Sequence, residues 1–470
     1  MHRRKRFLWM SFALSFALAG AARGQVVSQQ FNLSTPGARS LGMGGAFLGL
    51  ADDATAAYIN PAGLTNLTVG GPEVALEMRS WKYSTPYIAG GRLNGVPNNV
   101  GLDFGTGLSV VDAESEEAGL AFASFGYVLP HGLTFAIYTN QVADFSAGFL
   151  SEGWFYESEG GFDFGNGPTH RTTPVAVMSD IEVRSFGAAI AYEFRKPFSV
   201  SKERPISLGL GVAQYRLESL YQVAAFQVRS PWSEGEDTVI YDPFPTSGDG
   251  FFGRAQFLPA EITQLHQQEG DDTAVGLNLG ILWKLGKKSQ WSLGAVYRQG
   301  AEFETKRADQ FADSSEIRSK GTLTIPDTYG LGLAYSPPKS EGKTKFALDY
   351  QNVRYSQRLG DSIGNGPNPG FEIPDSDELH IGMERVVLTT GALVGTFRVG
   401  AWRETAHELE FEGSSSQGQA LYPPGRDLSH WSMGVGLVVR EDYQIDVAVD
   451  RSDRADVFSF SVVLFSNPFF

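Results

Sequence analysis

Apolar residues alternate with small or polar ones along most of this chain, in short segments separated by turn residues. In the clearest segment, 275–283, valine, leucine, isoleucine and tryptophan occupy every second position, mostly with glycine or asparagine between them. A period of two is typical of a β-strand with one apolar face. Fourteen such strands are predicted, at 73–84, 118–129, 133–149, 186–194, 206–212, 275–283, 291–297, 329–335, 346–350, 379–383, 397–401, 431–437, 443–449 and 458–464.

The predicted connections between these strands alternate in length. Short or moderate connections lie at 130–132, 195–204, 285–290, 336–342, 387–394 and 440–442, and long ones at 150–180, 227–271, 304–320, 358–377 and 410–429. Residues 99–111 are also assigned to a loop. An even number of strands with one short-loop rim and one long-loop rim predicts an all-β fold, an antiparallel transmembrane β-barrel. A soluble propeller or sandwich is the alternative, but it requires no rim of long loops.

Charged residues avoid the apolar face of the predicted strands. Asp349, His380, Glu384, Arg398 and Asp446 all fall on the opposite face. A basic residue that faces lipid at the bilayer midplane costs about 2–4 kcal/mol, which is enough to enforce this segregation. A soluble two-layer protein would instead bury the apolar face in a shared core. In hydrocarbon, the first and last strands must also pair, because an open edge would leave backbone groups unsatisfied.

The N-terminus has the layout of a secretory signal peptide. A basic start at 2–6 precedes an apolar run from Phe7 to Ala22, and small residues stand at Ala22 and Gly24. A retained anchor helix is the alternative, but Ser11 and Ser15 interrupt the short apolar run. We therefore predict a signal peptide at 1–24, an N-terminal plug at 25–72 and the barrel at 73–470.

Composition and charge exclude several functions. The 470 residues include 38 Lys and Arg against 53 Asp and Glu, and the one dense basic cluster lies in the predicted leader, so nucleic acid is not expected as a partner. The chain has no cysteine, which excludes disulfides, thiolate metal sites and cysteine nucleophiles. The seven histidines show no helical metal-ligand spacing. No metal and no cofactor are predicted.

The segment from Pro36 to Leu67 is rich in glycine and does not alternate. Its glycines at 42, 44, 45 and 49 permit tight backbone packing, and Asn60 with Pro61 favours a turn. A barrel of fourteen strands has a lumen too wide for its own side chains to fill, so a segment of this size suits a plug.

This segment, with its glycines, its Asp-Asp pair and Asn60, Pro61 and Ala62, resembles the N-terminal hatch of the FadL/TodX family of outer-membrane transporters. Residues 274–298, 325–335 and 346–355 resemble that family's middle strands. The resemblance implies passive uptake of long-chain fatty acids or aromatic hydrocarbons across the bacterial outer membrane. We expect a monomer in contact with outer-membrane lipid and lipopolysaccharide. A PorV-like barrel of a protein secretion pathway is the alternative.

The long connection at 227–271 is a candidate for ligand capture. Its apolar residues are Phe251, Phe252, Phe257, Leu258, Ile262 and Leu265, and Pro259 suits the first turn of a short helix. Exposed apolar residues at this density indicate a capture groove, unless they pack the loop onto itself.

The family resemblance also implies an apolar pocket bounded by the hatch and a sideways exit at an inward kink of the third strand. In this chain Asn140, Gln141 and Asp144 interrupt the apolar run of that strand, and the kink is predicted there; ordinary lumen-facing polarity is the alternative. A carboxylate cargo would require a basic partner, for which Arg39 and Arg398 are candidates unless they are salt-bridge partners.

Catalysis has little support in the sequence. His380 and Glu384 share one strand face, and no further member of a catalytic group can be assigned. An enzyme is not expected.

Overall fold

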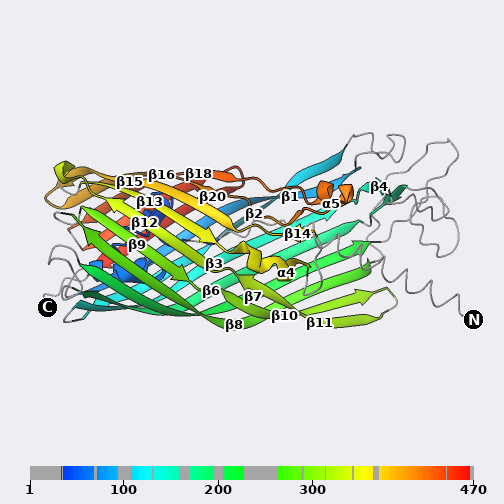
Figure 1. The fold of residues 1–470 in the computed structure, drawn as a ribbon, viewed down its shortest axis with the longest axis horizontal. Coiled ribbons are helices and arrows are strands. Elements are labelled where there is room, and N and C mark those ends of the chain that lie inside the picture. Colours follow the sequence, from blue (N-terminus) through cyan, green and yellow to red (C-terminus); the bar gives the residue numbers. More distant parts are fainter. Residues whose placement is uncertain are drawn as a thin grey trace, which may run out of the picture.

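Long antiparallel strands run obliquely around a lumen and close on one another in the computed structural model (Figure 1). The structure describes residues 33, 35–67, 71–93, 107–129, 132–157, 169–172, 174–194, 205–226, 262–286, 290–312, 314–340, 343–363, 370–440 and 442–465. The predicted leader and Phe251, Phe252, Phe257 and Leu258 of the predicted capture loop lie outside these residues.

The wall of the barrel consists, among the described residues, of sixteen strand segments in one sheet. They are β1 (Pro72–Gly91), β2 (Leu108–Val128), β3 (Leu133–Ser151), β6 (Val175–Phe194), β7 (Ile206–Phe226), β8 (Ile262–Leu285), β9 (Trp291–Arg298), β10 (Ala301–Phe311), β11 (Glu316–Ile325), β12 (Thr328–Tyr335), β13 (Thr344–Val353), β15 (Ser376–Thr390), β16 (Leu393–Glu404), β18 (Leu428–Val439), β19 (Tyr443–Arg451) and β20 (Ala455–Phe465).

Two pairs of segments are each one strand with a short interruption. β9 and β10 are separated by Gln299 and Gly300, and both pair with β8. β11 and β12 are separated by Pro326, which has no backbone N–H to donate, and Asp327. Asp327 Oδ1 accepts a hydrogen bond from Gly300 N at 2.7 Å, so the two interruptions are joined. Counted this way, the described wall is a closed antiparallel barrel of 14 strands, which confirms the predicted fold class.

Closure follows the predicted pairing of the chain's first and last strands. β1 and β20 form an antiparallel ladder from Glu73–Phe465 to Tyr83–Ala455. Because each edge strand has a partner here, the backbone polar groups at this seam are satisfied within the hydrocarbon layer.

Several strands extend farther than the sequence predicts. β2 begins at Leu108, β6 at Val175 and β8 at Ile262, and β10 and β11 form a hairpin inside the predicted loop at 304–320. The loop predictions at 99–111, 150–180, 227–271 and 304–320 were therefore wrong at these ends. The reason is physical: where a strand leaves the bilayer its outer face becomes polar, so apolar alternation stops before the hydrogen-bonded ladder does.

These extensions make the barrel taller on one side. β8 has 24 residues, whereas β19, across the barrel sheet, has nine. Short elements accompany the longer connections: β4 (Phe155–Glu157), β5 (Thr169–Arg171), η4 (Pro338–Ser340), η5 (Tyr355–Arg358), α4 (Leu359–Ile363), β14 (Phe371–Glu372), β17 (Glu410–Phe411) and α5 (Ser416–Leu421).

The outer surface carries an apolar belt bordered by aromatic rings. Leu331 of β12 is 62% exposed and lies between Tyr329 and Tyr335 on the same face. Tyr335 stacks on Trp291 and Tyr329 packs on Tyr297, with ring centroids 4.1 and 4.9 Å apart. Aromatic pairs at both borders of an apolar band are typical of strands that cross a membrane. No helix within the described ranges has the length and apolar character needed to cross a bilayer.

The inner face carries the charges. Asp349, His380, Glu384, Arg398 and Asp446 are all buried, which confirms their predicted place on the lumen side. Within the same lumen lie three short helices that precede β1: α2 (Ala38–Leu41), α3 (Ala56–Ile59) and η1 (Pro61–Asn66). Figure 1 shows this segment in dark blue inside one end of the barrel, whereas α4, α5 and β4 lie toward the other end. We call residues 35–67 the hatch.

A charge placed in the apolar belt tests its contact with lipid. We expect Leu331→Arg to lower the free energy of unfolding by about 2–4 kcal/mol, because the guanidinium would lie in hydrocarbon. Glu116→Arg is the control, since Glu116 is exposed on the outer face of β2 above the belt, where the expected cost is about 0–1 kcal/mol. Denaturant titration of both variants in lipid vesicles measures the difference. Equal effects of the two substitutions would contradict a lipid-facing belt.

Candidate functional site

The hatch is fixed to the wall through Asn60. Its side chain accepts a hydrogen bond from Ala62 N at 3.2 Å and so caps η1, whose first residue is Pro61. Its Nδ2 donates to Leu48 O at 2.9 Å and to Ile281 O of β8 at 3.2 Å. The Asn60, Pro61 and Ala62 sequence therefore ends one helical turn, begins another and binds the hatch to a strand.

Glycines line the wall where the hatch rests on it. A Cβ added to any of these wall glycines would meet hatch atoms: Gly209, Gly280, Gly294, Gly332, Gly382, Gly400 and Gly434. The hatch contributes glycines of its own, of which Gly44 and Gly45 have φ of +66° and +76°. Both positions suit glycine because of this backbone conformation. At Gly45 a side chain would also meet the His380 ring. The predicted tight backbone packing of the hatch is present.

A buried ion-pair network joins the hatch to β15 and β16. Arg39 Nη1 lies 2.7 Å from Asp52, and Arg39 Nε lies 2.8 Å from Glu384 of β15. Glu384 also accepts from Arg398 Nε at 2.7 Å, and Arg398 Nη1 lies 2.7 Å from Asp446. Arg39 and Arg398 are therefore salt-bridge partners in this structure, which is the alternative to their predicted role as partners of a carboxylate cargo.

Asp53 lies beside this network in the hatch. It is 3.3 Å from Arg39 and accepts hydrogen bonds from the backbone and hydroxyl of Thr55. Burial nevertheless raises the pKa of the Asp53 carboxyl above its ordinary value. Removing water from these charges makes each partner depend on the others, because an isolated buried ion is unfavourable.

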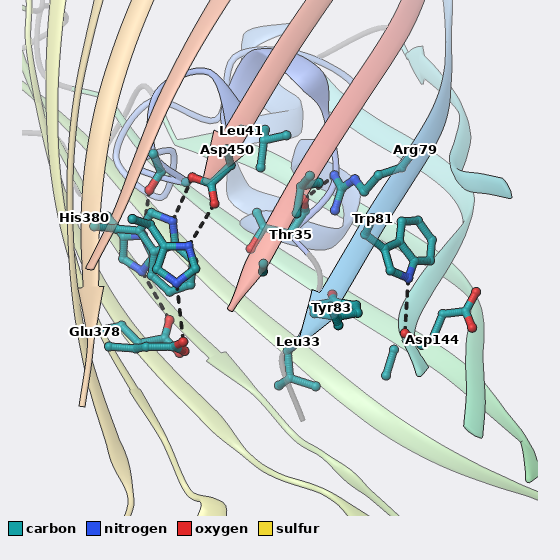
Figure 2. Close-up of a pocket in the computed structure, with 18 of the residues that line it drawn as sticks. Leu33, Thr35, Leu41, Arg79, Trp81, Tyr83, Asp144, Glu378, His380 and Asp450 are labelled. Atoms are coloured by element: carbon teal, nitrogen blue, oxygen red, sulfur yellow. Dashed lines mark hydrogen bonds and ion pairs between the residues drawn. The ribbon is translucent and has the colours of Figure 1, made fainter. Parts of the chain in front are cut away.

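A cavity of about 100 Å³ lies where the hatch meets the inner wall (Figure 2). Hatch residues on its surface are Thr35, Leu41, Gly44 and Gly45, and Leu33 precedes them. Trp81 and Tyr83 come from β1, and Trp402 from β16. Leu33 and the cavity-lining Tyr355 also belong to an apolar cluster with Ile373, Leu409 and Tyr422 of the outer connections. The cavity lining and this cluster thus share Leu33 and Tyr355.

One side of the cavity is a stack of three rings. Trp402 lies between His380 and His430, with centroid distances of 5.1 and 3.7 Å. His380 Nδ1 contacts the Gly44 carbonyl oxygen of the hatch at 2.7 Å. His430 Nδ1 lies 2.9 Å from Asp450, which also accepts from Trp402 Nε1 at 3.1 Å. The stack is therefore held at one end by the hatch and at the other by a strand carboxylate.

On another side of the cavity the wall loses its pairing. The β2–β3 ladder ends at Phe122 and Asn140, whereas β2 continues to pair with β1 and β3 with β6. A β-bulge in β3 lies between Gln141 and Ala143. We call this loss of pairing the β2–β3 break. Gln141, Ala143 and Asp144 line the cavity, so the break and the cavity share residues.

Beyond the break, β3 leans over the inner face of β1. Trp81 Nε1 donates to the backbone oxygen of Asp144 at 3.2 Å, and the Tyr87 and Phe149 rings stack at 4.4 Å. On the outer face of β2, apolar Leu120 is followed, toward the N-terminal end of the strand, by exposed Glu116 and other acidic residues. The break therefore lies at the upper border of the apolar belt. Asn140, Gln141 and Asp144, where the kink of the third strand is predicted, lie at this break or just beyond it, and β3 remains paired with β6 there except at the bulge.

The remaining predicted ligand residues lie elsewhere. Ile262 and Leu265 stand on β8, not in a loop helix after Pro259, because their segment continues the ladder with β7. Neither lines the cavity. Trp81, Trp402 and His430 line the cavity but were not predicted as site residues. Trp81 stands at an inward position of a predicted strand, whereas Trp402 and His430 lie one residue beyond the ends of the strands predicted at 397–401 and 431–437. The strand period carried no information on their common location.

Comparison with known proteins establishes the fold. The structure is similar to that of a Pseudomonas aeruginosa FadL homologue, with a TM-score of 0.58, 16% sequence identity and coverage of 93% of this chain and 99% of that chain. It is also similar to the CymD monoaromatic hydrocarbon channel (TM-score 0.53, 14% identity, 94% and 100% covered) and to the Ralstonia pickettii toluene transporter TbuX (0.52, 14%, 93% and 100%). No protein-family model and no curated protein sequence matches the chain. The chain therefore has the fold of the FadL and toluene-channel barrels.

A side chain at a wall glycine tests the seating of the hatch. A Cβ at Gly400 would collide with the Gly44 backbone, so we expect Gly400→Val to destabilise the barrel by about 1–3 kcal/mol. Displacement of the hatch should also raise ion conductance in planar bilayers. Gly391→Val is the control, because no atom lies within 4 Å of a Cβ there. Unchanged conductance and stability of Gly400→Val would show that the hatch does not depend on this contact.

Proposed function

We propose that this chain is an outer-membrane channel for the passive uptake of hydrophobic small molecules, with release sideways through the barrel wall. The observation that carries the proposal is the β2–β3 break beside the cavity. A strand that gives up its ladder inside a barrel wall leaves backbone groups unpaired, which is unfavourable near hydrocarbon. Such a break is expected where a path through the wall serves the function.

The apolar residues provide a route toward that break. A hydrophobic solute would first meet the outer connections, beneath whose surface Ile373, Leu409 and Tyr422 form one buried apolar cluster with Tyr355. Tyr355 also lines the cavity, and the cavity borders Ala143 of β3. Polar lipopolysaccharide opposes direct partitioning of apolar solutes, so a protein route past it removes the main barrier. The predicted capture residues Phe251, Phe252, Phe257 and Leu258 would act before this route begins.

The size of the cavity favours a small solute or one end of a long one. An apolar cavity of about 150 Å³ holds benzene, so a cavity of about 100 Å³ accepts part of a solute as it stands and a whole ring only if its lining moves. The proteins of similar structure include a channel for monoaromatic hydrocarbons and a toluene transporter. Aromatic hydrocarbons are therefore the first substrates to test, with long-chain fatty acids second.

Passage through the break can be tested by filling it. A Cβ at Gly119 of β2 would lie 3.8 Å from Gln141 Oε1, with space for a larger side chain. We expect Gly119→Phe to lower toluene or oleate uptake by about tenfold or more, since an increase of about 1.4 kcal/mol in a barrier has that effect on a rate. Ala118→Phe, on the exposed outer face of the same strand, is the control and should retain uptake.

The uptake measurement compares cells with and without the gene, and then the two variants at matched expression. Uptake that does not depend on the gene for either substrate would overturn the proposed function and favour the PorV-like alternative, which copurification with a secreted protein would support. Gene-dependent uptake that is equal in Gly119→Phe and Ala118→Phe would reject the lateral route alone.

A further inference from the structure

We infer that the cavity beneath the break accepts an apolar solute that carries a cationic hydrogen-bond donor, such as a primary ammonium, in preference to the matching carboxylate. The inference rests on the proposed function and specifies the substrate class of its site. It differs from the expectation that a charged cargo would be an anion bound by Arg39 or Arg398.

The first support is the balance of charge around the cavity. Its described lining contains four carboxylates, those of Asp144, Glu378, Glu404 and Asp450. The imidazoles that line it are those of His380 and His430, so protonation of both would still leave two carboxylates without a compensating charge. Glu404 and Asp450 are buried, and Asp144 and Glu378 are half-buried. Negative charge withdrawn from water without a partner is unfavourable, and a bound cation would relieve this excess.

The arginine on the cavity surface does not alter this balance. Arg79 Nε donates to Glu77 at 3.0 Å, and Arg79 Nη2 donates to the Thr35 carbonyl at 2.8 Å. Glu77 does not line the cavity, and its carboxylate neutralises the charge of Arg79. Arg39 and Arg398 are likewise engaged by Glu384 and its neighbours. A carboxylate ligand would have to displace a protein carboxylate from one of these guanidinium groups.

The second support is a pair of hydrogen-bond acceptors without donors. Glu404 is 1% exposed and Gln141 is 4% exposed, and the Oε1 atom of each has no hydrogen-bond partner. The nearest cation to Glu404 Oε1 is His430 Nε2 at 3.5 Å, beyond good hydrogen-bond geometry, and the bond of His430 to Asp450 is made by its other nitrogen, Nδ1. An ammonium offers three donors and no acceptor, which complements this lining.

The aromatic residues complete the site. Both faces of Trp402 are covered by imidazoles, but Trp81 and Tyr83 also line the cavity. Figure 2 shows Trp81 and Asp144 on one side, with Glu378, His380 and Asp450 on the other. A cation between these sides would lie among carboxylates and aromatic side chains, a combination that attracts ammonium groups. The net charge of −15 also favours the approach of cations.

Three ligands with one aromatic ring and different charge test the inference on the purified full-length protein in detergent. Benzylamine, toluene and benzoate are titrated while calorimetry and tryptophan fluorescence report binding. We expect benzylamine to bind at least tenfold more tightly than benzoate. Benzoate binding as tight as that of benzylamine would overturn the inference. If gene-dependent toluene uptake persists in that case, the proposed function stands without it.

A single substitution tests whether the charge of Glu404 contributes to the binding of benzylamine. Glu404→Gln keeps the shape of the side chain and removes its charge, and we expect it to weaken benzylamine binding about tenfold while toluene binding is unchanged. Glu116→Gln, the same change on the exposed outer face of β2, should leave both unchanged. Equal benzylamine affinity in the two variants would remove Glu404 from the site. The comparison of ligands on the unsubstituted protein decides the inference even if Glu404→Gln does not fold.

Discussion

Backbone hydrogen bonding in a medium without water is the constraint on which this structure depends. Every strand that crosses hydrocarbon needs a partner on each side, and the β1–β20 ladder satisfies this requirement where the chain's two ends meet. The same requirement makes the β2–β3 break significant, because β2 and β3 stop pairing there, beside an internal cavity. The indole N–H of Trp81 satisfies one carbonyl of the departing strand, that of Asp144. Side chains thus replace part of the ladder that the wall has lost.

The hatch is held by two different kinds of contact. Wall glycines such as Gly382 and Gly400 let its backbone lie directly against the strands, and the Arg39–Glu384–Arg398 network joins it to the wall by charge. Close packing fixes the hatch in position through many small contacts. The ion pairs add direction, since each guanidinium binds its carboxylate in a defined geometry. Together they hold in place the hatch residues that line the cavity.

The barrel was largely readable from the sequence, whereas the site was not. Strand number, the pairing of the ends and the inward place of residues such as Asp349 all follow from one period and from the exclusion of charge from lipid. The strand ends were misplaced at β2, β6 and β8 because polarity changes at the membrane border while pairing continues. The cavity gathers Trp81, Trp402 and His430 from strands far apart in sequence, and the strand period carries no information on which inward residues meet. The inward glycines, interpreted only as strand alternation, were the available sign of where the hatch rests.

The unequal strand lengths have a geometric consequence for the mouth of the barrel. At about 3.3 Å per residue, β8 is roughly 50 Å longer than β19 along its own path, so the rim is cut at a slant. A slanted rim gives the entrance a high wall on one side and an open approach on the other. Molecules that strike the high wall can continue along it toward the lumen, which converts a search through three dimensions into a search over a surface.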